Sequence, residues 1–389
     1  MRLRMRNSRY LHFLGQPQAP YLLIMTCVTF LSGLGLLMVL SASAVQSFEE
    51  SGSTYSIFLK QLLFLGIALI LMGIGLRLHN SYWEKLGRLA LPLGAIALLL
   101  PAVPGIGKQI NGNTNWIGFG PFTIQPSEFA KLLMILWAGV QLRKHHERLE
   151  RGVPSQGITL LAGIPFIFMG LVLVGRDLGT ALIFALIFMA LLFLSGIPYR
   201  QIATVLLLLL GGGLGMALAV PNRLHRFAAV GNPFAPSVYK LAGWQPAHAL
   251  MGLASGGLFG VGLGASRQKW ANLAEAHTDF IFSVIGEELG LLGTTVVIFL
   301  YATLLYAIFR TALQTKDLFE KYVVSGIGCW LLVQIFINLA TDVGIFPVVG
   351  VTLPFLSYGG SSLIANFLGI AFVLKVARRH MASVDGESR

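Results

Sequence analysis

Ten apolar segments run along this chain, and each is close to the length that a helix needs to cross a membrane. A helix requires about 20 apolar residues to span the hydrocarbon core of a bilayer. The segments cover residues 21–43, 57–77, 85–104, 126–142, 157–174, 178–196, 199–220, 280–309, 321–343 and 354–376. The breaks at 175–177 and 195–198 are short, so either flanking pair could instead form one long or re-entrant segment. We expect an all-α, polytopic membrane protein with ten transmembrane helices, built as a single domain over residues 1–389.

Composition agrees with a chain that lies mostly in lipid. Hydrophobic residues make up 55% of the chain and charged residues only 11%, whereas a soluble domain carries about 25% charged residues. The net charge of +12 raises the question of nucleic-acid binding, but no basic stretch alternates with aromatic residues on a soluble segment. Cys27 and Cys329 both lie inside apolar runs, which excludes a disulfide framework and a cysteine metal cluster. We expect no nucleic-acid partner and no dedicated metal ligands.

The lysines and arginines are distributed unevenly between alternate loops. If the N-terminus is cytoplasmic, 19 of the 28 fall on the cytoplasmic side and seven outside, with Lys60 and Lys131 inside apolar segments. Basic residues concentrate on the cytoplasmic side of membrane proteins, so we expect both end segments, 1–20 and 377–389, in the cytoplasm. Five of the seven outside residues lie in one long extracytoplasmic loop, 221–279, between the seventh and eighth segments.

A first polar segment precedes the fourth apolar segment. Pro126 suits the first turn of a helix, and Glu128 and Lys131 would then share one helical face. They could form only an interfacial ion pair, and Trp116 could be an ordinary tryptophan of the membrane interface. Alternatively, these residues contact a ligand, and the segment alone leaves both interpretations open.

A second polar segment ends the long loop and enters the eighth apolar segment. Asp279 could cap that helix. However, Glu275, His277 and Asp279 also crowd together beside Arg267 and Lys269 in the sequence. A carboxylate at the mouth of a polar cavity, flanked by cations, is typical of a site for an anionic, membrane-held substrate.

Two further acids lie deeper in the same apolar segment. Glu287 and Glu288 follow Asp279 by eight and nine residues, which is about 12–14 Å at helical rise. Ionisable groups at that depth are costly and usually face a cavity or a partner.

A third polar segment begins the last apolar segment, at 352–362. Its serines and glycines, which include Ser357, Gly359, Gly360 and Ser361, would expose hydroxyl and amide donors. The alternative is that these small residues only allow close helix packing.

Several strings along the chain together resemble the SEDS glycan polymerases, the FtsW/RodA family. They are QPSEFAK at 125–131, EAHTDFIFSVIGEELG at 275–290, TLPFLSYGGSS at 352–362, Asp-Leu-Gly-Thr at 177–180 and the glycine-rich run at 256–264. The resemblance extends from the first apolar segment to the last. It implies ten transmembrane helices, a large extracytoplasmic loop between helices seven and eight, and polymerisation of lipid II in the bacterial inner membrane.

Within the family the chain is more similar to FtsW, the division member, than to RodA, the elongation member. The strings at 266–270, 275–277, 286–288 and 352–355 favour FtsW, whereas 347–350 is closer to RodA.

Some positions depart from the family pattern. Thr114 and Asn115 stand where the family often has a basic pair, and Arg176 and Ala274 stand where it usually has proline. Asp342 is an additional acid near the end of the ninth segment.

The resemblance assigns roles to the candidate residues. Asp279 matches the essential aspartate of the family, and we expect it to act as the general base or to organise one. The candidates for phosphate contacts are Lys131, Arg223, Arg226, Arg267 and Lys269. The other expected substrate contacts are Trp116, Glu275, His277, Ser357, Gly359, Gly360 and Ser361. Mg²⁺ or another divalent cation could assist through one or two carboxylates and the substrate phosphates, although the sequence contains no dedicated cage for it.

The expected partners are lipid II, a class B penicillin-binding transpeptidase, and other membrane proteins of the division or elongation machinery. Two other functions remain open: a lipid II flippase, which also needs a polar cavity, and a non-enzymatic scaffold that recruits the transpeptidase. The cost of acids in or near the membrane argues against the scaffold.

Overall fold

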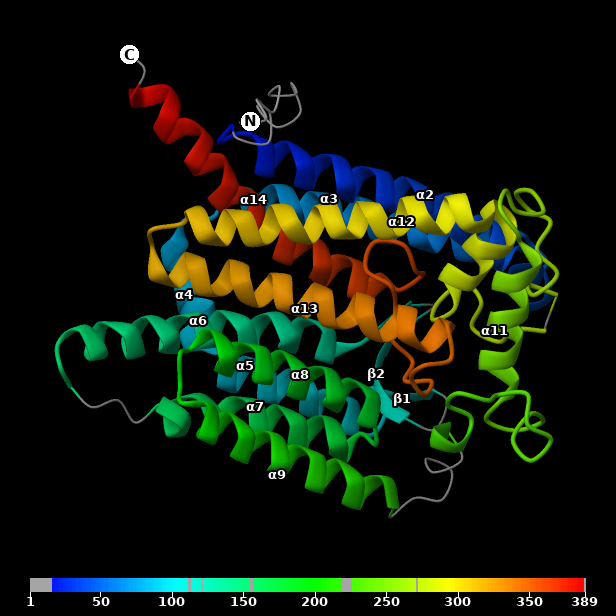
Figure 1. Ribbon diagram of the computed structural model, residues 1–389, viewed down its shortest axis with the longest axis horizontal. Coiled ribbons are helices and arrows are strands. Elements are labelled where there is room, and N and C mark those ends of the chain that lie inside the picture. Colours follow the sequence, from blue (N-terminus) through cyan, green and yellow to red (C-terminus); the bar gives the residue numbers. More distant parts are fainter. Residues whose placement is uncertain are drawn as a thin grey trace, which may run out of the picture.

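Each of the ten apolar segments contains helix in the computed structural model, which describes residues 16–110, 113–120, 122–153, 157–218, 226–270 and 272–387 (Figure 1). The helices are α2 (Ala19–Ser51), α3 (Ser56–Arg77), α4 (Asn80–Arg88), α5 (Ala90–Leu99), the short 3₁₀ helix η1 (Leu100–Ala102), α6 (Pro126–Glu150), α7 (Gly157–Val174), α8 (Leu178–Leu194), α9 (Tyr199–Leu218), α11 (Trp244–Ser255), α12 (Ile281–Gln314), α13 (Leu318–Asp342) and α14 (Gly360–Glu387).

Several of these helices can cross a membrane. Within the described residues, α2, α3, α12, α13 and the Gly360–His380 part of α14 are each long and apolar enough. The pair α4 and α5 adds a sixth if its 62° bend lies within one broken span. Three shorter apolar stretches accompany them, at Gly163–Val174, Leu178–Leu194 and Tyr199–Gly213. The chain is therefore mostly helical and contains several membrane-spanning helices.

The third and tenth segments begin at residues other than those predicted. The third, predicted at 85–104, begins at Asn80 and bends at Leu89, where the polar helix α4 gives way to the apolar α5. The tenth, predicted from residue 354, begins at Gly360. The residues before it turn, and Phe355 has a positive φ of 67°, which an α-helix does not allow.

The all-α prediction missed a small sheet and a loop helix. Strands β1 (Gly107–Ile110), β2 (Asn113–Phe119) and β3 (Phe122–Ile124) form an antiparallel sheet in the order β1-β2-β3, between η1 and α6. Such short strands give a weak periodic signal, and they lie between the predicted segments 85–104 and 126–142. Helix α11 lies inside the loop predicted at 221–279.

The central helices are α13 and α14. In their most apolar 18-residue stretches, 72% and 78% of the residues are buried, against 22% in α3. Helix α14 packs on α3, α12 packs on α2 and α13, and α13 packs on α6. Helix α2 begins and α14 ends at the same end of the bundle, while the sheet and α11 lie at the opposite end (Figure 1). We call this second end the loop end.

The two deep acids of α12 hold the glycine-rich loop that follows α11. Glu287 accepts hydrogen bonds from the Ser266 hydroxyl and the Arg267 and Gln268 amides. Glu288 accepts from the Ser41 hydroxyl at 2.6 Å. The acids therefore face partners, which is one of the two alternatives that their depth implied.

Candidate functional site

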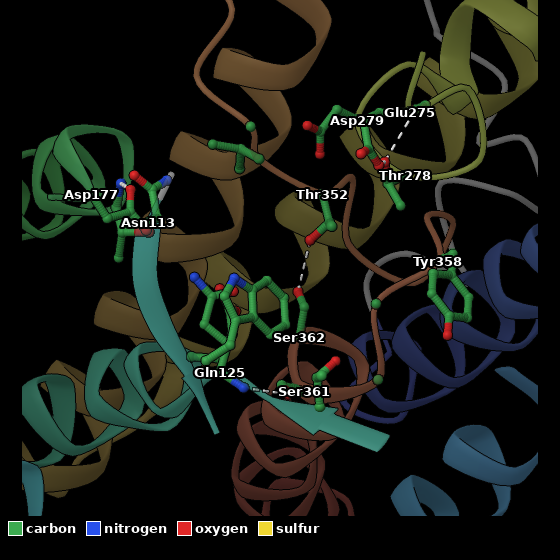
Figure 2. A pocket seen from close by; sticks show the side chains of 18 of the residues that line it. Asn113, Gln125, Asp177, Glu275, Thr278, Asp279, Thr352, Tyr358, Ser361 and Ser362 are labelled. Atoms are coloured by element: carbon green, nitrogen blue, oxygen red, sulfur yellow. Dashed lines mark hydrogen bonds between the residues drawn. The ribbon is translucent and has the colours of Figure 1, made fainter. Parts of the chain in front are cut away.

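A cavity of about 340 Å³ opens at the loop end of the bundle. Its wall combines residues of α3, the sheet, the starts of α6 and α8, the turn before α12 and the segment 348–362. Figure 2 shows Asp177 and Asp279 on different sides, Gln125 and Ser361 together at the bottom of the view, and Tyr358 at the right. The polar segments that are far apart in the sequence thus meet around one space.

Asp279 lines this cavity from the turn just before α12. The N-cap position of α12 is Phe280, and no described side chain caps it locally, so the capping alternative for Asp279 has no support in the structure. Burial raises the pKa of the Asp279 carboxyl from 3.8 to about 7; nearby Glu275 and Asp177 raise it further, and Arg226 lowers it. A carboxylate with a pKa near 7 suits a general base.

The last turn of α13 holds Asp279 from behind. The Asn338 amide donates to the carbonyls of Asp279 and Val351, both at 2.7 Å. One turn later, the Asp342 carboxylate accepts from the Ser283 amide and hydroxyl at 3.0 and 3.1 Å. Ser283 is the third residue of α12, so Asp342 caps that helix from a neighbouring one. We call this pair of contacts the α13 clamp.

The residues around Asp279 in the cavity carry charges of both signs. Asp177 caps α8 by accepting from the Thr180 amide and hydroxyl at 2.8 and 2.7 Å. Glu275 accepts from the Thr278 hydroxyl at 2.8 Å, and Arg226 donates to the Val348 carbonyl at 3.1 Å. No group of three His, Cys, Asp or Glu side chains among the described residues could hold a metal ion. The carboxylates of Asp177, Glu275 and Asp279 suit proton transfer, or a hydrated cation shared with an anionic ligand.

Some residues of the serine and glycine segment line the cavity, and Ser357 instead stabilises the turn that the segment forms. Gly359, Gly360 and Ser361 line the cavity, and the Ser361 hydroxyl accepts from the Gln125 amide at 2.9 Å. The Ser357 hydroxyl instead accepts from the Leu353 amide at 2.8 Å, inside the turn.

His277 supports the same turn from the other side. Its carbonyl accepts from the Tyr358 amide at 2.9 Å, and its ring lies 5.4 Å from the Tyr358 ring. Burial lowers the pKa of the imidazole. The structure thus places His277 behind the cavity wall.

Trp116 and Glu128 line the cavity, which places Trp116 at the candidate site. Lys131 is fully buried beneath Glu128, with 2.9 Å between its ammonium and the carboxylate, and it lies 5.4 Å from the Trp330 ring. The second Glu128 oxygen has no hydrogen-bond partner among the described residues.

The remaining predicted cations lie elsewhere. Arg267 is exposed. Lys269 lies 3.8 Å from Glu288 and donates to the Gly264 carbonyl. Both belong to the loop that the α12 acids hold, away from the cavity lining that the described residues form. Arg223 lies outside the described residues.

Sequence reasoning missed Lys60, Gln125 and Asn338 as site residues. Lys60 and Gln125 line the cavity, and Asn338 holds Asp279. The available signal for Lys60 and Asn338 was a polar side chain inside an apolar segment, which is costly without a role.

Comparisons with known proteins agree with this architecture. The FtsW/RodA/SpoVE family model, described as "Cell cycle protein", matches residues 21–382. The chain is 37% identical over 358 residues to the probable peptidoglycan glycosyltransferase FtsW of Coxiella burnetii, covering 91% of this chain and 95% of the relative. It is 36% identical over 362 residues to the stage V sporulation protein E of Bacillus subtilis, covering 92% and 97%.

Solved structures agree as well. The rod shape determining protein RodA of Thermus thermophilus superposes with a TM-score of 0.65 at 30% identity, covering 92% of this chain and 96% of that one. A chain from a structure described as "Structural coordination of polymerization and crosslinking by a peptidoglycan synthase complex" gives a TM-score of 0.70 at 29% identity, covering 92% and 97%. The family match, the relatives and the shared fold confirm the resemblance: this chain belongs to the FtsW/RodA/SpoVE family.

Proposed function

We propose that this chain is a peptidoglycan glycosyltransferase that polymerises lipid II. The observation that carries the proposal is the position of the Asp279 carboxyl. It lines a cavity that the cation Arg226 also lines, and its pKa is raised to about 7. The names of the curated relatives, peptidoglycan glycosyltransferase FtsW among them, support the same activity.

The reaction joins two lipid-linked saccharides. Asp279 accepts the proton of the acceptor 4-hydroxyl, whose oxygen forms a bond to the anomeric carbon of the donor. The bond from that carbon to the diphosphate oxygen breaks, and the lipid diphosphate leaves with the electron pair. Arg226 stabilises the charge that develops there. When bound, a divalent cation would neutralise the same diphosphate, with Glu275 as its carboxylate ligand.

The remaining wall residues hold the sugars. Trp116 offers an aromatic face for a sugar or prenyl chain, and the Ser361 hydroxyl and the amides near Gly359 and Gly360 offer hydrogen bonds. Glu275 fixes the turn that carries Asp279. Lys131, Arg267 and Lys269 contribute indirectly, through Glu128 and through the loop that Glu288 holds.

We also propose ten membrane passes in the bacterial inner membrane, with the loop end and its cavity on the extracytoplasmic side. Both termini then lie in the cytoplasm. The common position of the start of α2 and the end of α14 (Figure 1) and the distribution of basic residues support this topology. Reporter fusions test it: a fusion after residue 250 should report outside and a C-terminal fusion inside, and the opposite C-terminal result would contradict it.

The partner we propose is a class B penicillin-binding transpeptidase, and the machinery is that of division. Structural similarity to a chain of a complex that couples polymerization to crosslinking supports the partner. The motif strings that are more similar to FtsW, the division member, and the family description "Cell cycle protein" support the division role over lateral growth.

Purified protein in detergent or nanodiscs, with its transpeptidase and purified lipid II, tests the activity. Glycan chains on a gel, absent with Asp279→Ala, are the expected result. Labelled lipid II that crosses a vesicle membrane without forming polymer would instead indicate a flippase. Partner binding with neither activity would indicate a scaffold.

A further inference from the structure

Lys60 places a second positive charge in the cavity, on the wall formed by α3. Lys60 and Arg226 are the cationic residues in its lining, as far as the described residues show. Lys60 is half-buried and belongs to a helix that is otherwise strongly apolar. An ionisable residue in such a helix is expensive to keep and usually faces a partner or a functional cavity.

The next residue fixes the position of Lys60. Gln61 is almost fully buried; its amide donates to the Ser357 carbonyl at 3.2 Å and accepts from the Gly359 amide at 3.3 Å. A side chain at Gly360 would meet the Phe64 ring at 2.6 Å. This part of α3 is therefore docked tightly on the turn before α14, and Lys60 is held beside that turn.

Three other buried or half-buried lysines have protein partners, whereas Lys60 faces a cavity. Lys131 pairs with Glu128, Lys269 with Glu288, and Lys375 donates to Asn80 at 2.5 Å. Among the described residues, no hydrogen bond or ion pair engages Lys60. Its charge is available to an anionic ligand. The positive end of the α14 dipole, at Gly360, lies on the same wall and favours an anion there.

The proposed reaction requires two anionic subsites. The diphosphate of the donor must lie close to the base, because it leaves from the carbon that the activated hydroxyl attacks. The diphosphate of the acceptor is separated from that hydroxyl by the acceptor disaccharide, so it must lie away from the base. Arg226 donates to the Val348 carbonyl, and a Cβ added at Gly350, two residues further on, would lie 3.5 Å from the Asp279 carboxylate. Arg226 is therefore near the base, whereas Lys60 lies at the turn before α14.

We propose that Lys60 binds the diphosphate of the acceptor lipid, and that Arg226 serves the donor. This assignment rests on the proposed glycosyltransferase function. It gives the α3 wall a specific role, which is to position the acceptor saccharide so that its far hydroxyl reaches Asp279.

Kinetics with separate donor and acceptor test the assignment. A fluorescent lipid II with its 4-hydroxyl blocked serves only as donor and is held at saturation, while unlabelled lipid II is varied as acceptor. Lys60→Met should raise the acceptor KM about tenfold, the typical loss for a hydrogen bond to a charged group, with little change in kcat or donor KM. Lys60→Arg should restore most of the affinity. Lys240→Met, which removes an exposed charge from the outer loop, is the matched control and should match wild type.

A direct binding measurement tests the Lys60 subsite independently of the proposed glycosyltransferase reaction. Undecaprenyl diphosphate is titrated into Asp279→Asn protein with and without Lys60→Met, so that no turnover is needed. Weaker binding with Lys60→Met supports the subsite even if polymer never forms. An unchanged acceptor KM and unchanged binding would overturn the proposal, as would a loss that Lys60→Arg does not repair. Equal displacement of the probe by phosphatidylglycerol would also overturn it, because the site would then select ordinary anionic lipid.

Discussion

Replacement of Asp279 by asparagine separates a chemical role from a structural one. The two side chains have nearly the same shape, and the carboxylate accepts no hydrogen bond from any described residue. The contact that Asn338 makes is to the Asp279 carbonyl, which the substitution retains. We expect the free energy of unfolding to change by no more than about 0.5 kcal/mol, as for a substitution away from structural features.

The effect on rate should be much larger. An amide cannot accept the proton, and loss of a general base costs about 10²–10⁴-fold in rate, or about 2.7–5.4 kcal/mol of barrier at 1.36 kcal/mol for each factor of ten. Initial rates of glycan formation from lipid II, with thermal unfolding and transpeptidase binding as controls, measure both effects. A variant that polymerises within about threefold of wild type would refute the base assignment, since even the smallest expected effect exceeds that.

Other substitutions test the surroundings of the base. Glu275→Gln removes a negative charge that raises the pKa of Asp279. In wild type, kcat/KM should rise with pH with a midpoint near 7, and in the variant this midpoint should move to lower pH. A midpoint that stays in place or moves to higher pH contradicts the electrostatic argument. Asn338→Leu leaves two buried carbonyls unpaired, each costing about 1–3 kcal/mol, and should lower both the melting temperature and kcat, whereas full activity would show that the α13 clamp is dispensable. Trp116→Ala should lose polymerase activity in a protein that still inserts and folds. Wild-type activity would show that Trp116 is only an ordinary tryptophan of the membrane interface.

The sequence predicted the helices and the family well because apolar length and long motifs are local signals. Asp279 was found through its motif, and in the structure it lines the cavity. The positions of Arg267 and Lys269 were not predictable from their nearness to Asp279 in sequence, because the chain turns between them and two acids of α12 hold their loop.

The contacts that organise the site are mostly non-local. Asn338 and Asp342 each reach residues 59 positions away, and Gln61 contacts residues nearly 300 positions away. No periodicity within one segment encodes such pairings. Lys60 was recognised as a charge inside a span, but only the docking of α3 on the turn before α14 gives that charge a place in the cavity.

Two departures from the family pattern lie against each other in space, although some 60 residues separate them in the sequence. The Thr114 amide donates to the Gly175 carbonyl at 3.2 Å. An added side chain at Gly175 would lie 1.5 Å from the Asn115 amide oxygen. The positions that lack the basic pair therefore abut the turn that carries Arg176 in place of proline. The two segments therefore form one packed contact, and we expect that grafting either segment alone into a relative would disrupt this contact, whereas exchanging both together would preserve it.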